Sequence, residues 1–408
     1  MADSFKPETP EQVREAVAWA AAEETPLEVL GNGSKRALGR PSNAETTLEL
    51  SAIRGITLYE PEELVLTAGP GTPLAEIETA LAGARQELAF EPPDYGPLLG
   101  VDAGAGSVAG MLACNLAGPR RIKAGAARDH FLGFQAVSGR GEIFKSGGRV
   151  VKNVTGYDLS KLLCGSWGTL GVMTEVTVKV LPKAEKAWTA MVYGLGWASA
   201  GAAMTRALQS PYEVSGAAYL PRDLAQKSGV SLVSGGGGSV TAIRVEGPAP
   251  SVEYRLAALR QMLGEFGETE ELHSKNTATL WRELRDVTPF ASPGDKRCVW
   301  KLSVPPKDGP AVTAALLEAT SGEAFLDWGG GLIWLAVDAP NDASHETVRQ
   351  AIAETGGHAT LIRAPEPVRA AVPVFHPPSP GIGQLSRRVK ENFDPNRVLN
   401  PGRLYADM

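Results

Sequence analysis

Four glycine-rich segments in the first half of the sequence constrain this chain more than any other feature. They are Gly31–Lys35, Ala68–Thr72, Gly104–Gly110 and Gly165–Gly171. Each segment lies where a predicted strand or helix begins or ends. Because glycine has no Cβ, its backbone N–H groups can approach a phosphate closely, and a helix N-terminus adds a favourable potential. The segments therefore predict a nucleotide-type cofactor whose phosphates are held by several loops.

Two common phosphate-binding motifs do not account for these segments. The spacing Gly104-x-Gly106-x-x-Ala109 matches the dinucleotide fingerprint of Rossmann folds, and Asp129 follows about twenty residues later. That fingerprint requires a buried strand before the first glycine, whereas residues 92–102 read as a loop, and Asp129 precedes a predicted strand instead of ending one. A Gly-x-x-x-x-Gly-Lys-Ser/Thr sequence does not occur either. We therefore exclude both motifs.

Length and composition limit the classes of protein to which the chain can belong. Its 408 residues suggest two or three folding units, and its net charge of −6 argues against nucleic acid as the main partner. The three cysteines, Cys114, Cys164 and Cys298, form no CxxC and predict neither a zinc ribbon nor an iron–sulfur cluster. Because the sequence shows no long apolar run and no secretory signal, we expect no membrane span and a cytoplasmic location.

The character of the sequence changes twice along the chain. Residues 1–182 contain the glycine-rich segments and end in the alternating strand Val172–Leu181. Residues 183–362 combine alanine-rich helices with short strands, which predicts a compact α+β domain. Residues 363–408 begin with a proline-rich loop and continue into a helix and an extended tail. The predicted fold class is α+β.

Five stretches of the sequence together carry a family resemblance. They are Leu27–Arg40, Glu63–Ile77, Gly106–Gly118, Gly165–Val172 and Phe393–Arg403. In residue types and in order, they resemble FAD-binding flavoproteins of the p-cresol methylhydroxylase/vanillyl-alcohol oxidase type, in particular the FAD-binding E subunits of glycolate oxidases. The resemblance implies an FAD-binding domain over 1–182, an α+β cap domain over 183–362, and a C-terminal segment, 363–408, that returns toward the flavin.

The family pattern, carried over to this sequence, implies four groups of FAD-contacting residues. Gly31, Asn32, Gly33, Ser34 and Lys35 would wrap the FAD pyrophosphate, and Gly69, Gly71 and Thr72 would lie beside it. Gly106, Ser107, Gly110, Asn115 and Gly118 would hold the phosphates and the ribityl chain, and Gly168, Thr169, Leu170, Gly171 and Val172 would contact the adenosine end. The alternative is that some glycines, above all in the second and fourth groups, only permit tight turns.

Histidine and cysteine, which bind flavin covalently in some family members, are missing from the first loop. Residues 31–39 contain neither, and Cys114 lies on a predicted apolar helix face, so we expect non-covalent FAD. The five histidines are isolated from one another, so we expect no metal site. Oxidation of a hydroxy acid needs a base for the hydroxyl proton and a cation for the carboxylate. His376 is our candidate base and Arg297 or Arg387 our candidate anion clamp; the catalytic residues are otherwise open.

The resemblance implies an FAD-dependent oxidoreductase subunit of a glycolate oxidase-like complex that acts on a small 2-hydroxy acid. Its implied partners are a catalytic flavoprotein subunit and an iron–sulfur subunit. Two alternatives stay open at this point. One is a self-sufficient FAD-dependent oxidase or dehydrogenase of a hydroxy acid or alcohol, and the other is a non-catalytic assembly subunit with structural FAD.

Overall fold

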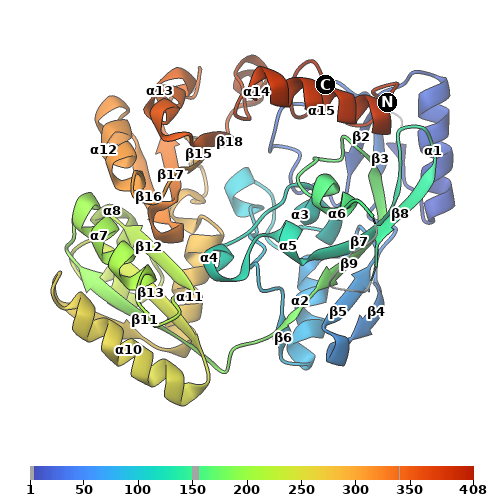
Figure 1. Ribbon diagram of the computed structural model, residues 1–408. Helices are drawn as coiled ribbons and strands as arrows, with labels where there is room; N and C mark the ends of the chain where they lie inside the picture. The colour runs from blue at the N-terminus through green and yellow to red at the C-terminus, as the bar shows by residue number, and fades with distance from the viewer. Residues whose placement is uncertain (1–3, 149–155, 340) are drawn as a thin grey trace. The chain divides into compact units, whose positions relative to one another are not determined.

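The computed structural model of the chain describes residues 4–148, 156–339 and 341–408. Its internal contacts divide the chain into two compact units. The first unit comprises Met1–Leu116, Gly125–Lys183 and Pro373–Met408, and the second comprises Ala117–Ala124 and Ala184–Val372 (Figure 1). Residues 117–124 and 363–372 thus group with the second unit. The domain limits that we expected at residues 182 and 362 remain predictions.

The first unit is built on two sheets and a strand pair. A three-stranded parallel sheet has the order β1–β3–β2, a five-stranded antiparallel sheet has the order β4–β5–β9–β7–β8, and β6 pairs with β10. The strands are β1 (Ser4–Phe5), β2 (Leu27–Leu30), β3 (Thr46–Glu49), β4 (Ile56–Glu60), β5 (Val65–Ala68), β6 (Gln86–Glu87), β7 (Phe131–Val137), β8 (Ile143–Gly147), β9 (Val172–Lys179) and β10 (Leu181–Pro182). The helices are α1 (Pro10–Ala22), α2 (Leu74–Gly83), α3 (Val108–Ala113), α5 (Ala127–His130), α6 (Leu159–Leu163) and α15 (Pro380–Phe393).

Helix α1 and residues near the C-terminus share one apolar core with the parallel sheet. The helix begins at Thr9, whose Oγ1 accepts a hydrogen bond from Gln12 N (3.2 Å), and Pro10 occupies its first position. The buried residues of this core include Val13, Ala16, Val17, Ala20, Leu27, Leu48, Leu50, Val398 and Leu399. The first and last parts of the first unit are therefore held together by apolar packing.

A buried ion pair fixes the segment after α15. Lys390 Nζ lies 2.5 Å from Asp394 Oδ2, and both side chains are buried. Lys390 also donates hydrogen bonds to the carbonyl oxygens of Thr169 and Leu399, each at 2.8 Å. Asp394 accepts from the N–H groups of Val398 (3.1 Å) and Leu399 (2.9 Å). The pair thus connects the C-terminal segment to the fourth glycine-rich segment.

The second unit is an eight-stranded antiparallel sheet with helices packed on it. Its strand order is β14–β11–β13–β12–β16–β17–β15–β18. The strands are β11 (Lys186–Tyr193), β12 (Gly216–Leu220), β13 (Val240–Gly247), β14 (Thr269–Leu272), β15 (Cys298–Ser303), β16 (Glu323–Asp327), β17 (Leu332–Val337) and β18 (His358–Arg363). The helices are α4 (Arg121–Ala124), α7 (Trp197–Leu208), α8 (Arg222–Ala225), α9 (Ser231–Ser234), α10 (Ala249–Leu263), α11 (Ser274–Arg285), α12 (Gly309–Ala319), α13 (His345–Ala351) and α14 (Glu366–Ala371).

The segment 117–124 is tied to this sheet by an ion pair. Arg120 binds the Glu246 carboxylate through two nitrogens, at 3.0 and 2.7 Å, and Arg244 Nε lies 3.6 Å from the same carboxylate. Burial opposes ionisation of Glu246, but Arg244 and Arg120 together outweigh it and lower the pKa of Glu246 to about 2. Glu246 is therefore a partly buried carboxylate that stays ionised.

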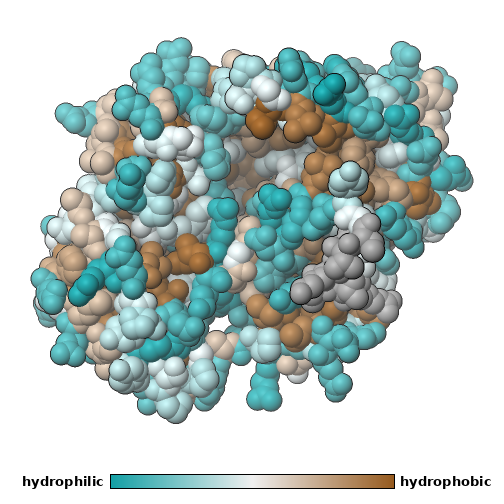
Figure 2. Space-filling view, viewed as in Figure 1, coloured by the Kyte–Doolittle hydropathy of each residue, from teal (hydrophilic) through white to brown (hydrophobic). Residues whose placement is uncertain are grey.

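The face of the molecule drawn in Figure 2 carries hydrophilic and hydrophobic side chains side by side. Ile382 and Leu385 on α15 are among the most exposed large apolar residues, at 57% and 56%. None of the helices in the described parts of the chain has both the length and the apolar character that crossing a membrane requires.

Candidate functional site

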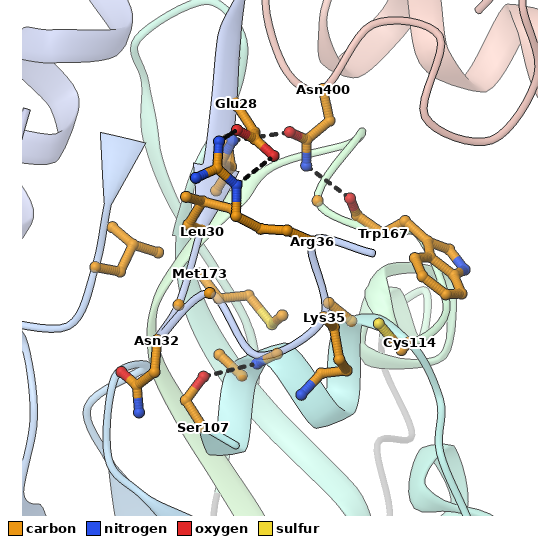
Figure 3. Close-up of a pocket in the computed structure, with 18 of the residues that line it drawn as sticks. Glu28, Leu30, Asn32, Lys35, Arg36, Ser107, Cys114, Trp167, Met173 and Asn400 are labelled. Atoms are coloured by element: carbon orange, nitrogen blue, oxygen red, sulfur yellow. Dashed lines mark hydrogen bonds and ion pairs between the residues drawn. The ribbon is translucent and has the colours of Figure 1, made fainter. Parts of the chain in front are cut away.

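A pocket in the first unit contains about 740 Å³ of open space and is shown in Figure 3. Most of its wall comes from β2 with the loop that follows it, α3, the turn around Gly168 and the tail after α15, and Leu50 and Met173 complete it. Its lining residues are Glu28, Val29, Leu30, Gly31, Asn32, Gly33, Ser34, Lys35, Arg36, Leu50, Ser107, Ala109, Gly110, Ala113, Cys114, Trp167, Gly168, Gly171, Met173, Asn400 and Arg403. Nine of the residues predicted to contact FAD are among them.

The first glycine-rich loop needs its glycines for two reasons. A Cβ on Gly31 would collide with the Ser107 hydroxyl, so only glycine lets this loop approach the start of α3. Gly33 has φ +74°, which lies in the left-handed region that favours glycine. The loop therefore passes close to α3 and lines the pocket along its whole length, from Gly31 to Lys35.

Lys35 extends toward the start of α3 (Figure 3). Its Nζ lies 3.1 Å from Ser34 Oγ, and a Cβ on Gly106 or Gly110 would lie 3.8 or 3.7 Å from the same ammonium. Burial lowers the pKa of Lys35, while Cys114 and Asp94 raise it to a smaller extent. A bound anion would offset the cost of burying this charge. The space beside the ammonium is kept open by glycine and suits phosphate oxygens.

The second glycine-rich segment supports α3 from outside the pocket. The carbonyl oxygens of Thr72 and Pro70 accept hydrogen bonds from Val108 N (3.0 Å) and Ala109 N (3.2 Å), which are the first two N–H groups of the helix. Ser107 Oγ accepts from Gly110 N at 3.4 Å. These N–H groups therefore have protein partners. Of the predicted phosphate-binding groups, Lys35 and the first loop line the pocket without this role in supporting α3.

Gly69, Gly71 and Thr72 have packing roles in the structure. A Cβ on Gly69 would lie 2.7 Å from Ile53 O, and one on Gly71 would lie 2.5 Å from Leu50 O. Thr72 is fully buried, and its hydroxyl bonds the backbone of the same turn and of a neighbouring one. Gly71 lines a separate hollow that also contains Asn32. The tight-turn alternative thus describes this segment well, and its contact with FAD stays a prediction.

Gly106, Asn115 and Gly118, which we predicted to hold the phosphates and the ribityl chain, are not among the residues that line the pocket. Gly106 lies beside Lys35, and Asn115 (φ +49°) accepts a hydrogen bond from Arg128 N at 3.2 Å. Gly118 groups with the second unit, where its carbonyl accepts from Trp328 Nε1 at 3.1 Å.

The fourth segment is divided between the pocket and the core of the first unit. Gly168 and Gly171 line the pocket, whereas Thr169, Leu170 and Val172 are buried. Val172 belongs to the apolar core shared with α1.

Two tail residues that the sequence analysis did not name hold the pocket together. Asn400 Oδ1 accepts from Val29 N and Asn400 Nδ2 donates to Trp167 O, both at 2.8 Å. Arg403 donates to the carbonyl oxygens of Lys35 (2.9 Å) and Arg40 (3.0 Å). Both residues lie in the stretch Phe393–Arg403, which carries part of the family resemblance. That resemblance is the feature of the sequence that could have pointed to them. They bind backbone groups of the loops that form the pocket wall.

We expected Cys114 on an apolar helix face, and this expectation is wrong. It follows α3 directly and lines the pocket. Burial raises the pKa of its thiol to about 11, against smaller opposite effects of Lys35 and Arg403. The thiol is therefore protonated at neutral pH, and a protonated thiol is a poor nucleophile. Non-covalent binding of FAD stays our prediction.

None of the three candidate catalytic residues lines this pocket. Arg297 pairs with Asp295 (2.8 Å) and Glu323 (2.6 Å) in the second unit. Arg387 pairs with Asp407 at 2.8 Å, and the carbonyl of His376 accepts from the Tyr405 hydroxyl at 3.3 Å. The two arginines already neutralise carboxylates of the chain itself. Within the described ranges, no cluster of three or more His, Cys, Asp or Glu side chains is arranged to hold a metal.

Comparison with known proteins identifies the class of protein to which this fold belongs. The model of the FAD binding domain family matches residues 4–147, which contain the first loop, Lys35 and α3. Substrate-bound p-cresol methylhydroxylase superposes with a TM-score of 0.72 over 99% of this chain and 88% of that chain, at 13% sequence identity. The fold is therefore that of p-cresol methylhydroxylase-type FAD-binding flavoproteins, as predicted, and FAD is the cofactor.

The chain belongs to the family of the glycolate oxidase subunit GlcE. It is 37% identical to GlcE of Escherichia coli (strain K12) over 400 residues, which cover 98% of this chain and 97% of that protein. It is also 23% identical over 429 residues to the glycolate oxidase subunit GlcD of Bacillus subtilis (strain 168), covering 98% and 88% of the two chains. The predicted class, an FAD-dependent oxidoreductase, is confirmed by this family membership.

Proposed function

We propose that this chain binds FAD non-covalently in the pocket of the first unit and acts as the FAD-binding subunit of a glycolate oxidase-like complex. The observation that carries the placement is Lys35, whose ammonium faces space that Gly106 and Gly110 keep open. A pyrophosphate placed there would meet one cation and the backbone N–H groups of the loop 31–35. Glu28, the carboxylate in the lining, is already paired with Arg36 and so would repel the phosphates less.

The proposed reaction is the oxidation of a small 2-hydroxy acid. Two relatives are named as glycolate oxidase subunits, and glycolate is the simplest acid of this class. Bound FAD would supply the two-electron oxidation. In this chain, Lys35 and its loop would hold the pyrophosphate, while Asn400 and Arg403 would hold the backbone of that loop and of the Trp167 turn in place.

The proposal includes partners and a location. Both relatives carry the word subunit in their names, which supports an assembly. We expect a catalytic flavoprotein subunit and an iron–sulfur subunit in the same complex, and we expect the complex to work in the cytoplasm.

Replacement of Lys35 tests the cofactor site. We expect Lys35→Met to weaken FAD binding by about 10- to 100-fold, because a hydrogen bond to a charged group contributes about 1.5–3 kcal/mol. Lys145→Met is the matched control, since Lys145 is exposed on β8. The measurement is titration of the flavin-depleted full chain with FAD, followed by flavin fluorescence. Equal affinities of the Lys35 and Lys145 variants would place the pyrophosphate elsewhere.

Comparison of the isolated chain with its complex tests the role of a subunit. We expect the FAD-loaded chain alone to oxidise glycolate or D-lactate at least about a hundredfold more slowly than the complex, which corresponds to roughly 2.7 kcal/mol of activation free energy. The measurement is dye reduction at equal flavin concentration, with the complex purified from native extract and its subunits identified. Comparable rates would favour a self-sufficient dehydrogenase, and absence of flavin bleaching in the anaerobic complex would favour structural FAD.

A further inference from the structure

The second unit has a groove between helices α7 and α12, which pack against each other (Figure 1). The groove contains about 1170 Å³ of open space, and every residue that lines it belongs to the second unit. It is therefore a feature of one folded unit and is separate from the FAD pocket, which lies in the first unit.

Small side chains form the bottom and the sides of this groove. Gly201 of α7 and Pro310 of α12 are buried, and a Cβ on Gly201 would lie 2.5 Å from Pro310 Cγ, so the two helices touch at this point. Beside this contact, the exposed positions that line the groove carry alanine, as at Ala202 on α7 and at Ala311 and Ala314 on α12. Because alanine side chains are short, the space above the contact stays open.

Aromatic side chains add apolar surface to the wall. Trp197, at the start of α7, and Phe266, after α10, line the groove and are only half-buried. Burying the rest of such rings against another molecule is favourable in proportion to the apolar area removed from water. The groove thus offers a second molecule an apolar contact surface.

Two positive charges flank the groove. Arg206 lies on α7, Lys307 lies directly before α12, and both are exposed. Within the ranges that the structure describes, neither side chain takes part in an ion pair. The described lining residues include no carboxylate, although the whole chain has a net charge of −6. The charge at this groove is therefore opposite in sign to that of the protein, and it is complementary to an acidic partner.

We propose that the groove binds a helix of a partner subunit that presents small apolar side chains to the groove and carboxylates to Arg206 and Lys307. The lining positions Ala198, Ala202, Thr205 and Gln209 recur every three or four residues along one face of α7, and at 1.5 Å per residue they extend over about 17 Å. Three turns of an amphipathic helix match that length, and small residues permit the close approach of helix axes. This inference rests on the proposed function for the existence of a partner subunit.

Purification of the assembled complex tests the groove. The full-length chain, tagged and expressed in its native host in place of the wild-type copy, is purified, and the subunits recovered with it are identified and quantified by mass spectrometry. We expect Ala202→Trp, which fills the groove, and Arg206→Glu/Lys307→Glu, which reverses its charge, each to lower recovery of the partner subunit at least about tenfold. Ala278→Trp and Lys275→Glu, on exposed positions of α11, are the matched controls and should assemble normally.

Further measurements separate a lost contact from a misfolded unit. All variants should keep the circular dichroism and the flavin content of wild type, and Arg206→Lys, which retains the charge, should keep the partner. A photo-reactive phenylalanine at position 202 should cross-link to a segment of the partner that contains carboxylates at helical spacing.

Three results would count against the groove or against the function on which it depends. Normal recovery of the partner with either groove variant would overturn the inference and leave the proposed function intact. A cross-link to a second copy of this chain, or to a segment without carboxylates, would overturn it as well. Purification of wild type without any partner subunit would instead refute the proposed function itself.

Discussion

The buried Lys390–Asp394 pair allows a specific prediction about stability and cofactor binding. We expect Asp394→Ala to lower the free energy of unfolding of the first unit by about 3–5 kcal/mol, the usual effect of removing one partner from a buried ion pair. Because the pair connects the C-terminal segment to Thr169, in the same turn as the pocket residue Gly168, we also expect the variant to retain less FAD after dialysis than wild type does.

The magnitude follows from the partners that each group would lose. In Asp394→Ala, the Lys390 ammonium keeps two carbonyl oxygens but no counter-charge in a site from which solvent is excluded. The N–H groups of Val398 and Leu399 also lose their acceptor, and each unsatisfied buried group costs about 1–3 kcal/mol. Total stabilities of domains are about 5–15 kcal/mol, so the variant should be close to the limit of stable folding.

Urea denaturation of the FAD-loaded protein, followed by flavin fluorescence, measures this effect. Arg387 lies on the same helix as Lys390, and Arg387→Met removes its exposed ion pair with Asp407. This variant should change the unfolding free energy by less than about 0.5 kcal/mol. The double variant Lys390→Met/Asp394→Leu should remain destabilised, because the four backbone groups bound by the pair lose their partners. A loss below about 1 kcal/mol in Asp394→Ala would refute this reasoning.

Three further predictions concern the flavin and the pH dependence. Acid precipitation should release all flavin as FAD, because the Cys114 thiol is protonated; flavin that stays with the polypeptide would show a covalent link. Gly33→Glu should abolish FAD binding, because like charges ~4 Å apart repel by about 4 kcal/mol at an effective dielectric near 20. His376→Ala should keep its flavin. Normal flavin content in Gly33→Glu would show that the loop 31–35 is not part of the FAD site. The pKa of Glu246 is about 2 in the folded protein against the ordinary 4.5. This difference adds about 3 kcal/mol to the free energy of unfolding, which is fully present above pH 4.5 and is lost as the pH falls toward 2. The stability difference between wild type and Glu246→Gln in urea should therefore shrink over that interval, and a constant difference would contradict the assignment.

Local sequence patterns were sufficient to predict much of the first unit. The alternating strand predicted at Val172–Leu181 is present as β9 and β10, and the loop Gly31–Lys35 follows β2 as expected. A strand is specified by neighbouring residues, and a glycine that tolerates positive φ marks a turn wherever it occurs. These features depend on short-range interactions, which a sequence displays directly.

The roles of individual glycines could not be separated from sequence. Gly31 and Gly71 both lack room for a Cβ, but the atom in the way is the Ser107 hydroxyl at the pocket in one case and the Leu50 carbonyl in the other. Close approach to a phosphate and close approach to another backbone select the same residue type. Only the tertiary structure shows which partner each glycine faces.

Long-range polar contacts were equally hidden in the sequence. Asn400 and Arg403 lie in a short tail, and their partners Val29 and Lys35 are more than 360 residues away. Lys301 lies in a strand that otherwise reads as apolar, and the two tryptophan rings near its ammonium come from another strand and from a turn. No spacing rule connects such residues, because the sheet order that brings them together is itself non-local.

The way in which the tail closes the pocket has a consequence for synthesis of the protein. The ribosome makes the glycine loop and its lysine early, but the side chains of Asn400 and Arg403 that fix this loop are made more than 360 residues later. A chain interrupted before residue 400 would contain every residue that we predict to bind phosphate, and its loop would still lack the support of Asn400 and Arg403. Stable loading with flavin would then wait until residues 400–403 have emerged and packed against the loop.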